Sequence, residues 1–95
     1  MAIKSGTVNI DAAGTAQAFS ATREVFCSLT VQAHPDNAGD VYVGGPAVSS
    51  ATGIVLGPGD SFPLLSSEGD SINIQFLYGD AANTGDDINF IGVAR

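Results

Sequence analysis

The sequence has 95 residues, 44% of them hydrophobic, and its ten acidic and three basic residues give a formal net charge of −7. A chain of this length buries one hydrophobic core, and Lys4, Arg23 and Arg95 are too few cations to neutralise nucleic-acid phosphates or anionic lipid headgroups. We therefore expect one domain over residues 1–95 that binds neither nucleic acid nor membrane. The acidic surface either keeps the protein soluble or docks on a basic partner.

Alternation of apolar and polar residues over short segments predicts β-strands with one buried face. In chain order the predicted strands are Lys4 to Ile10, Ala16 to Ser20, Glu24 to Ala33, Val41 to Val43, Ile54 to Leu56, Ser61 to Leu65, Ser71 to Tyr78 and Ile88 to Ala94. The alanine-rich segment 11–21 contains Gly14 and Thr15, which favour a turn followed by a strand over a short helix. Seven to eight short strands separated by Gly and Pro turns predict an all-β fold, a small antiparallel β-sandwich of the jelly-roll type.

The alternation also predicts which side chains point into the core. In Glu24 to Ala33 the inward row is Val25, Cys27, Leu29, Val31 and Ala33, which leaves Phe26 on the outer face. In Ser71 to Tyr78 the inward row is Ile72, Ile74, Phe76 and Tyr78, which leaves Leu77 outside. Apolar residues on outer faces are either covered by loops or buried against another subunit. The predicted interface residues are Phe26, Leu77, Phe62, Ile91 and Val93.

No set of residues in the sequence predicts catalysis or a cofactor. Cys27, the only cysteine, and His34, the only histidine, lie seven residues apart in one strand and its end, and Cys27 is expected to point into the core. The glycine-rich segments 44–46 and 57–59 lack the Lys-Ser/Thr and the helix of a phosphate-binding loop, so we interpret them as tight turns. No apolar run has the length of a signal peptide or a membrane span, which predicts a protein that is made and kept in the cytoplasm or carried out inside something else.

The acidic loops contain candidate ligands for calcium. Asp80, Asn83, Asp86 and Asp87 place oxygen-bearing side chains in one loop, and Asp36, Asn37 and Asp40 form a second group. Calcium takes six to eight oxygen ligands, and neither loop has the spacing of an EF-hand. The alternative is that these side chains cap turns by accepting backbone hydrogen bonds.

The central segment carries a recognisable order of motifs. A strand and turn, Val41-Tyr42-Val43-Gly44-Gly45, is followed by a Ser/Thr-rich connection, and Thr52-Gly53-Ile54 then leads to Gly57-Pro58-Gly59-Asp60. This order resembles that of small β-sandwich virion proteins of tailed bacteriophages. The resemblance covers residues 24–65 well, residues 66–95 loosely and the N-terminus hardly at all.

The resemblance implies a structural role in a virus particle and transfers no catalytic residue. We expect a non-enzymatic virion protein, in the first place a capsid decoration or cement protein that binds the major capsid protein in many copies or as a homo-oligomer. A tail, baseplate or fibre-base component that contacts other virion proteins is the alternative. A carbohydrate-binding module is a third reading, which the lack of Trp and the positions of Tyr42 and Tyr78 within strands disfavour. Residues 1–10 are a candidate arm that reaches a neighbouring subunit.

Overall fold

The computed structural model describes residues 2–65 and 71–94, and these residues form mainly β-strands joined by turns. The strands are β1 (Ala2–Asn9), β2 (Gln17–Ala18), β3 (Val25–Ala33), β4 (Val41–Gly44), β5 (Ile54–Leu56), β6 (Ser61–Leu65), β7 (Ile72–Asn73), β8 (Tyr78–Ala81) and β9 (Asp87–Ala94). One turn of 3-10 helix, η1 (Ile74–Phe76), lies between β7 and β8. The predicted strands are confirmed except in segment 71–78, and segment 11–21 is a turn followed by the short strand β2.

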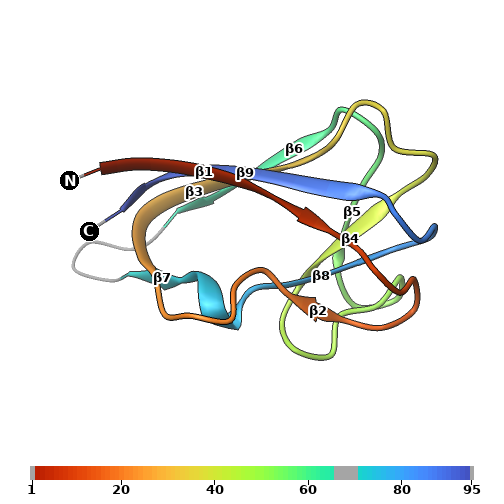
Figure 1. Cartoon of the computed structure of the whole chain (residues 1–95), viewed down its shortest axis with the longest axis horizontal. Coiled ribbons are helices and arrows are strands. Elements are labelled where there is room, and N and C mark those ends of the chain that lie inside the picture. The colour runs from red at the N-terminus through yellow and green to blue at the C-terminus, as the bar shows by residue number, and fades with distance from the viewer. Residues whose placement is uncertain (1, 66–70, 95) are drawn as a thin grey trace.

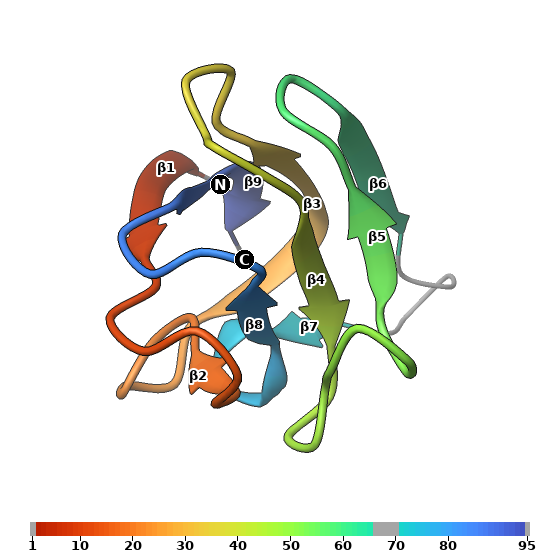
Figure 2. The ribbon, with the colours of Figure 1, turned by 90° about the vertical axis from the view of Figure 1, so that its right-hand side faces the viewer.

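The strands form two antiparallel sheets that pack against each other (Figure 1). One sheet has the order β1-β9-β3-β6, with β7 beside β3, and the other has the order β2-β8-β4-β5 (Figure 2). Strands from the two halves of the chain pair in reverse order: β1 with β9, β2 with β8, β3 with β6, and β4 with β5. The chain is thus a long hairpin folded over into two sheets. This arrangement is a jelly roll and confirms the predicted β-sandwich.

The hydrophobic core lies between the two sheets. The first sheet contributes Leu29, Val31, Ala33 and Ile88, each 1% exposed or less, and the second contributes Val41, Val43 and Leu56. Phe19, which follows β2, meets Phe90 of β9 with ring centroids 6.0 Å apart and the planes tilted by 46°. Tilted aromatic pairs of this kind stabilise a fold by about 0.5–1.5 kcal/mol beyond the burial of their area. The pair therefore ties the two sheets together.

A β-bulge in β3 reverses the predicted orientation of its first residues. Phe26 lies opposite Ala94 and Ser28 lies opposite Val93, so Cys27 is an extra residue in β3 with no counterpart in β9. A bulge shifts the alternation of side chains by one residue. Phe26 consequently points into the core and is 0% exposed, while Cys27 is only half-buried. The prediction that Cys27 faces the core and Phe26 faces outward is wrong.

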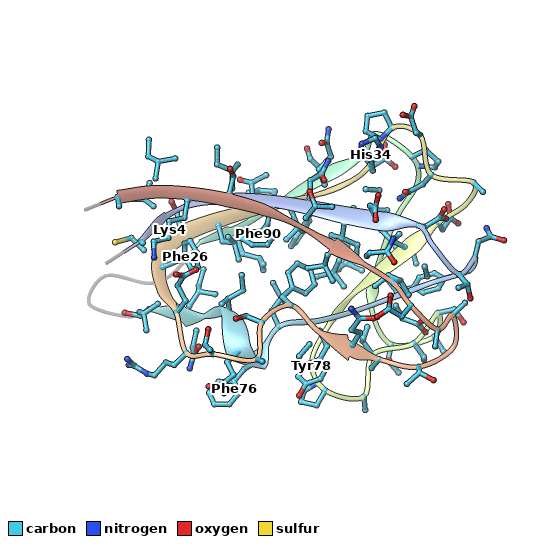
Figure 3. The ribbon with its side chains drawn as sticks, viewed as in Figure 1. Lys4, Phe26, His34, Phe76, Tyr78 and Phe90 are labelled. Atoms are coloured by element: carbon cyan, nitrogen blue, oxygen red, sulfur yellow. The ribbon has the colours of Figure 1, made fainter. Side chains whose placement is uncertain are left out.

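The predicted strand Ser71 to Tyr78 is interrupted by η1, which reverses a second orientation. Asn73 caps this turn because its Oδ1 accepts a hydrogen bond from the backbone N–H of Gln75 at 3.0 Å. The turn carries Phe76 outward, where it is 68% exposed, and brings Leu77 into the core, where it is 9% exposed. Figure 3 shows Phe76 and Tyr78 pointing away from the space between the sheets, whereas Phe26 and Phe90 point into it. The predicted positions of Phe76 and Leu77 are therefore wrong.

The N-terminal segment is an edge strand of the first sheet. Residues Ala2 to Asn9 pair with β9 along their whole length, and the Lys4 ammonium forms an ion pair with the Glu24 carboxylate at 2.5 Å. Both groups are partly exposed, so this ion pair stabilises the fold by less than about 1 kcal/mol. The hydrogen-bonded ladder, which extends to Ala94, holds the strand in place. Within this chain β1 is thus part of the first sheet, and an arm role of residues 1–10 toward a neighbouring subunit remains a prediction.

We predict that Phe26→Ala lowers the free energy of unfolding by about 3–5 kcal/mol, because it removes a fully buried ring and leaves a cavity. Phe76→Ala is the matched control, and it should cost less than about 1 kcal/mol because the Phe76 ring is 68% exposed. Urea unfolding followed by circular dichroism measures both changes. A larger loss for Phe76→Ala than for Phe26→Ala would contradict the bulged register of β3.

Candidate functional site

The outer face of the first sheet is the most distinctive surface of the molecule. The register of β1, β9, β3 and β6 places its side chains in three cross-strand rows. The rows are Ile3, Val93 and Ser28; Ser5, Ile91, Thr30 and Pro63; and Thr7, Asn89, Gln32 and Ser61. We call these residues the uncharged face. They come from strands far apart in the sequence, so only the folded chain brings them together.

Apolar side chains dominate the two rows nearest the chain termini. Ile3 is 75% exposed and Ile91 is 52% exposed, and Val93 is directly opposite Ile3 in the ladder. Pro63 is exposed in the edge strand β6, the position where a strand tolerates a residue without a backbone donor. Exposed Ile side chains on either side of a half-buried Val are typical of a contact surface.

The third row is polar and its side chains are already linked. Thr7 Oγ1 donates a hydrogen bond to Asn89 Oδ1 at 2.9 Å, and Asn89 Nδ2 donates to Gln32 Oε1 at 3.5 Å. A shallow hollow of about 380 Å³ lies next to this row and is lined in part by Thr30, Gln32 and Ile91. The uncharged face thus has an apolar part toward the chain termini and a part with amide and hydroxyl groups at the polar row.

Charge is absent from the described side chains of this face, although the whole chain has a net charge of −7. The first charged group beyond the polar row is Asp87, whose Oδ1 accepts a hydrogen bond from Asn9 Nδ2 at 2.8 Å. Charged residues are depleted at the centres of protein interfaces, because they lose solvation there. The uncharged face is therefore the surface best suited to burial against another protein.

The predicted interface residues fall into three groups. Ile91 and Val93 lie on the uncharged face, two positions apart in β9 and therefore on the same side of the sheet. Phe62 is half-buried and packs against the core. Phe26 and Leu77 are core residues in the described fold and are not accessible to a partner. An interface role for Ile91, Val93 and Phe62 remains a prediction.

Ile3 and Phe76 are exposed apolar residues that the sequence did not single out. Ile3 alternates with Ser5 and Thr7, a pattern that marks one face of β1, but only the pairing with β9 places Ile3 beside Val93. The alternation predicts a core position for Phe76, and the turn η1 interrupts that alternation. The sequence signal for that turn was Asn73, a residue type that favours caps.

Among the predicted calcium candidates, Asp86 accepts hydrogen bonds from backbone N–H groups of another loop. Asp86 is 7% exposed, and its two oxygens accept hydrogen bonds from the N–H groups of Ala38 and Gly39 at 3.0 and 3.1 Å. Asn37 completes this junction, because it donates to the carbonyl of Asp87 and accepts from its N–H, both at 2.8 Å. Asp86 thereby ties loop 34–40 to loop 82–87.

The other calcium candidates lie apart from Asp86. Asp80 bonds to the backbone of Gly14, and Asp87 bonds to Asn9. Asn83 contributes a backbone carbonyl, which accepts from the Asp86 N–H at 3.4 Å. Among the described residues no three His, Cys, Asp or Glu side chains come together in a way that could hold a metal ion. The geometry favours the turn-capping alternative.

Cys27 and His34 lie near opposite ends of β3. They are seven positions apart along an extended strand, which corresponds to roughly 20 Å, and Figure 3 shows His34 at the end of the molecule away from Lys4 and Phe26. His34 Nδ1 accepts a hydrogen bond from the backbone N–H of Asp36 at 3.0 Å, which makes it part of a turn. The two side chains cannot form a nucleophile–base pair within one subunit.

Comparison with known proteins does not identify a family for this chain. No protein family, no curated protein and no solved structure matches the chain. In the part of the chain that the structure describes, no helix is long and apolar enough to cross a membrane.

We predict that Asp86→Ala lowers the free energy of unfolding by about 2–3 kcal/mol, because it leaves the N–H groups of Ala38 and Gly39 without their acceptor. Asp36→Ala is the matched control, since its side chain is 93% exposed and its loss should cost about 0.5 kcal/mol or less. Urea denaturation measures both variants. Excess calcium should leave the melting temperature of the wild-type protein unchanged, and a rise would show that the loop carboxylates are ligands.

Proposed function

We propose that this chain is a non-enzymatic structural protein of a tailed-bacteriophage virion, a capsid decoration protein that binds the major capsid protein through the uncharged face. The observation that carries the proposal is the contrast between this face and the rest of the chain. A protein with ten acidic and three basic residues keeps three cross-strand rows free of charge and lines two of them with exposed Ile and Pro side chains and the half-buried Val93. Exposure of apolar side chains to water is unfavourable, whereas their burial against a protein partner is favourable.

Two further observations support a role in assembly. The order of motifs over residues 24–65 resembles that of small phage virion proteins. The jelly roll is also an architecture of viral capsid domains, although the same architecture serves other functions, so it supports the proposal without carrying it.

The size of the uncharged face bears on how the protein would bind. Four strands about 4.8 Å apart and three rows about 6.8 Å apart cover roughly 400 Å². A standard interface buries about 800 Å² on each partner, so this face alone gives a weak contact. Weak contacts become effective when many copies bind a repeating surface, or when copies of the chain associate and bind together. Both situations are met on a capsid lattice.

The acidic loops lie beyond the polar row of the uncharged face, at the end opposite its apolar rows. Asp36, Asp40 and Asp60 are exposed at the end of the molecule where β3 and β9 meet the loops. When the uncharged face is buried on a capsid, such acidic residues stay in solvent and keep the decorated particles from associating with each other. The proposal therefore gives separate roles to the apolar and the acidic surfaces.

The location of the protein in purified phage particles tests the proposal directly. Quantitative mass spectrometry and cryo-electron microscopy of particles from the encoding phage should find many copies spread over the shell. A few copies at one vertex, in the baseplate or at the fibre base would establish the tail alternative. Absence of the protein from purified particles would overturn the virion assignment.

We predict that Ile91→Asp abolishes incorporation into particles, because it places a carboxylate at the centre of the buried face. Ile3→Asp, on the edge strand β1, should have the same effect with less disturbance of the sheet. Phe76→Asp is the control, since it makes the same change of charge at an exposed ring outside the uncharged face. Melting curves establish that each variant is folded. Normal incorporation of folded Ile91→Asp and Ile3→Asp would show that this face is not the contact.

A further inference from the structure

The outer face of the second sheet contains a polar hollow of about 350 Å³. Its floor is formed by Tyr42 of β4 and Asp80 of β8, which are directly opposite each other in the antiparallel ladder. Gly14, in the turn before β2, and Ser50, in the connection between β4 and β5, belong to its walls. We call this hollow the Asp80 pocket. Figure 2 shows β8 and β4 side by side, with the turn before β2 on one side and the connection to β5 on the other.

Asp80 is the residue in this pocket that most needs a physical explanation. It is a carboxylate that is only 3% exposed. Two hydrogen bonds reach it, from the backbone N–H groups of Gly14 and Ala81 at 2.8 Å each, and both end on Oδ1. Every described side-chain oxygen that is closed off from solvent has a hydrogen-bond partner. Neither of the two hydrogen bonds ends on Oδ2, so Oδ2 remains accessible from the pocket that Asp80 lines.

Within residues 2–65 and 71–94, no cationic side chain forms an ion pair with this carboxylate. The ion pairs among the described residues join Lys4 to Glu24 and His34 to Asp36, and neither reaches Asp80. A carboxylate this deeply buried loses much of its solvation, and a single oxygen bonded to backbone amides compensates only part of that loss. A cation bound at Oδ2 would compensate the rest.

Tyr42 indicates which kind of cation fits. Its half-buried ring lies beside Asp80 across the ladder, where facing Cβ atoms are about 4.5–5.5 Å apart. A planar guanidinium can lie on an aromatic ring while its N–H groups donate to a carboxylate, a combination that an ammonium group matches less well. Its remaining N–H groups are within the reach of hydroxyls such as that of Ser50 at the rim.

We propose that the Asp80 pocket binds the guanidinium group of an arginine side chain presented by a partner protein. The net charge of −7 draws a basic segment toward the molecule, and Asp80 and Tyr42 provide the specific contacts. This site is on the sheet opposite the uncharged face, and its chemistry does not depend on the protein being part of a virion. It would give the protein a second, charge-dependent contact besides the apolar one.

A titration followed by amide NMR tests the site with a defined probe. N-acetyl-arginine methylamide should shift the amide signals of Gly14, Tyr42 and Ala81 with weak but saturable affinity. N-acetyl-citrulline methylamide, which has the same shape without the charge, should leave these signals in place. Asp80→Asn should weaken arginine binding roughly tenfold to a hundredfold, because an amide N–H₂ replaces the acceptor while Asn Oδ1 still accepts from Gly14.

Control variants separate the pocket from the general acidity of the protein. Asp36→Asn removes one charge from a fully solvated position and should change the affinity less than about twofold. Tyr42→Leu removes the ring and should weaken binding even if Asp80→Asn does not fold. Equal binding of the arginine and citrulline probes, or shifts of the same signals by glucose and not by arginine, would overturn the proposal. If Tyr42→Leu and Asp80→Asn both fold and both bind the arginine probe as tightly as the wild-type protein, the proposal is also overturned.

Discussion

The pairing of β3 with β9 at the centre of the first sheet determines both faces of that sheet. The bulge at Cys27 sets the phase of β3, so that Phe26 enters the core while Ser28 and Thr30 lie opposite Val93 and Ile91 on the outside. Gly92 makes this approach possible, because a Cβ there would lie 2.5 Å from the carbonyl oxygen of Ser28 and 2.7 Å from the Phe26 ring. Core packing and the composition of the uncharged face are thus consequences of one ladder.

β9 is apolar on both sides, and the jelly-roll topology explains only the side that faces the core. β9 lies between β1 and β3, with Ile88 and Ala94 facing the core and Ile91 and Val93 facing outward. The side that faces the core needs apolar residues in any sandwich. Apolar residues on the outer side of a central strand have no such requirement. In our proposal they are explained by a capsid surface that covers the uncharged face.

The acidic residues of the chain differ in what they do. Asp86 joins two loops through both of its oxygens, and Asp60 closes a turn by accepting the Gly57 N–H at 3.0 Å. These carboxylates replace the backbone partners that loops lack. Asp80 also bonds through one oxygen only, but unlike the exposed Asp60 it is 3% exposed, and in our proposal its other oxygen binds a ligand. Net charge alone does not distinguish them.

The sequence by itself determined the strand positions, the turns between them and the class of fold, because period-two alternation and turn residues act over a few neighbouring positions. It also placed Ile91 and Val93 outside, since β9 has no bulge to change its phase. The tertiary structure decided the phase of β3 and the turn η1, and so moved Phe26 and Leu77 into the core and Phe76 out of it. It also decided which strands lie side by side, and thereby assembled the uncharged face and placed Tyr42 opposite Asp80. Bulges and strand pairing depend on contacts between residues far apart in the chain, which local patterns do not encode.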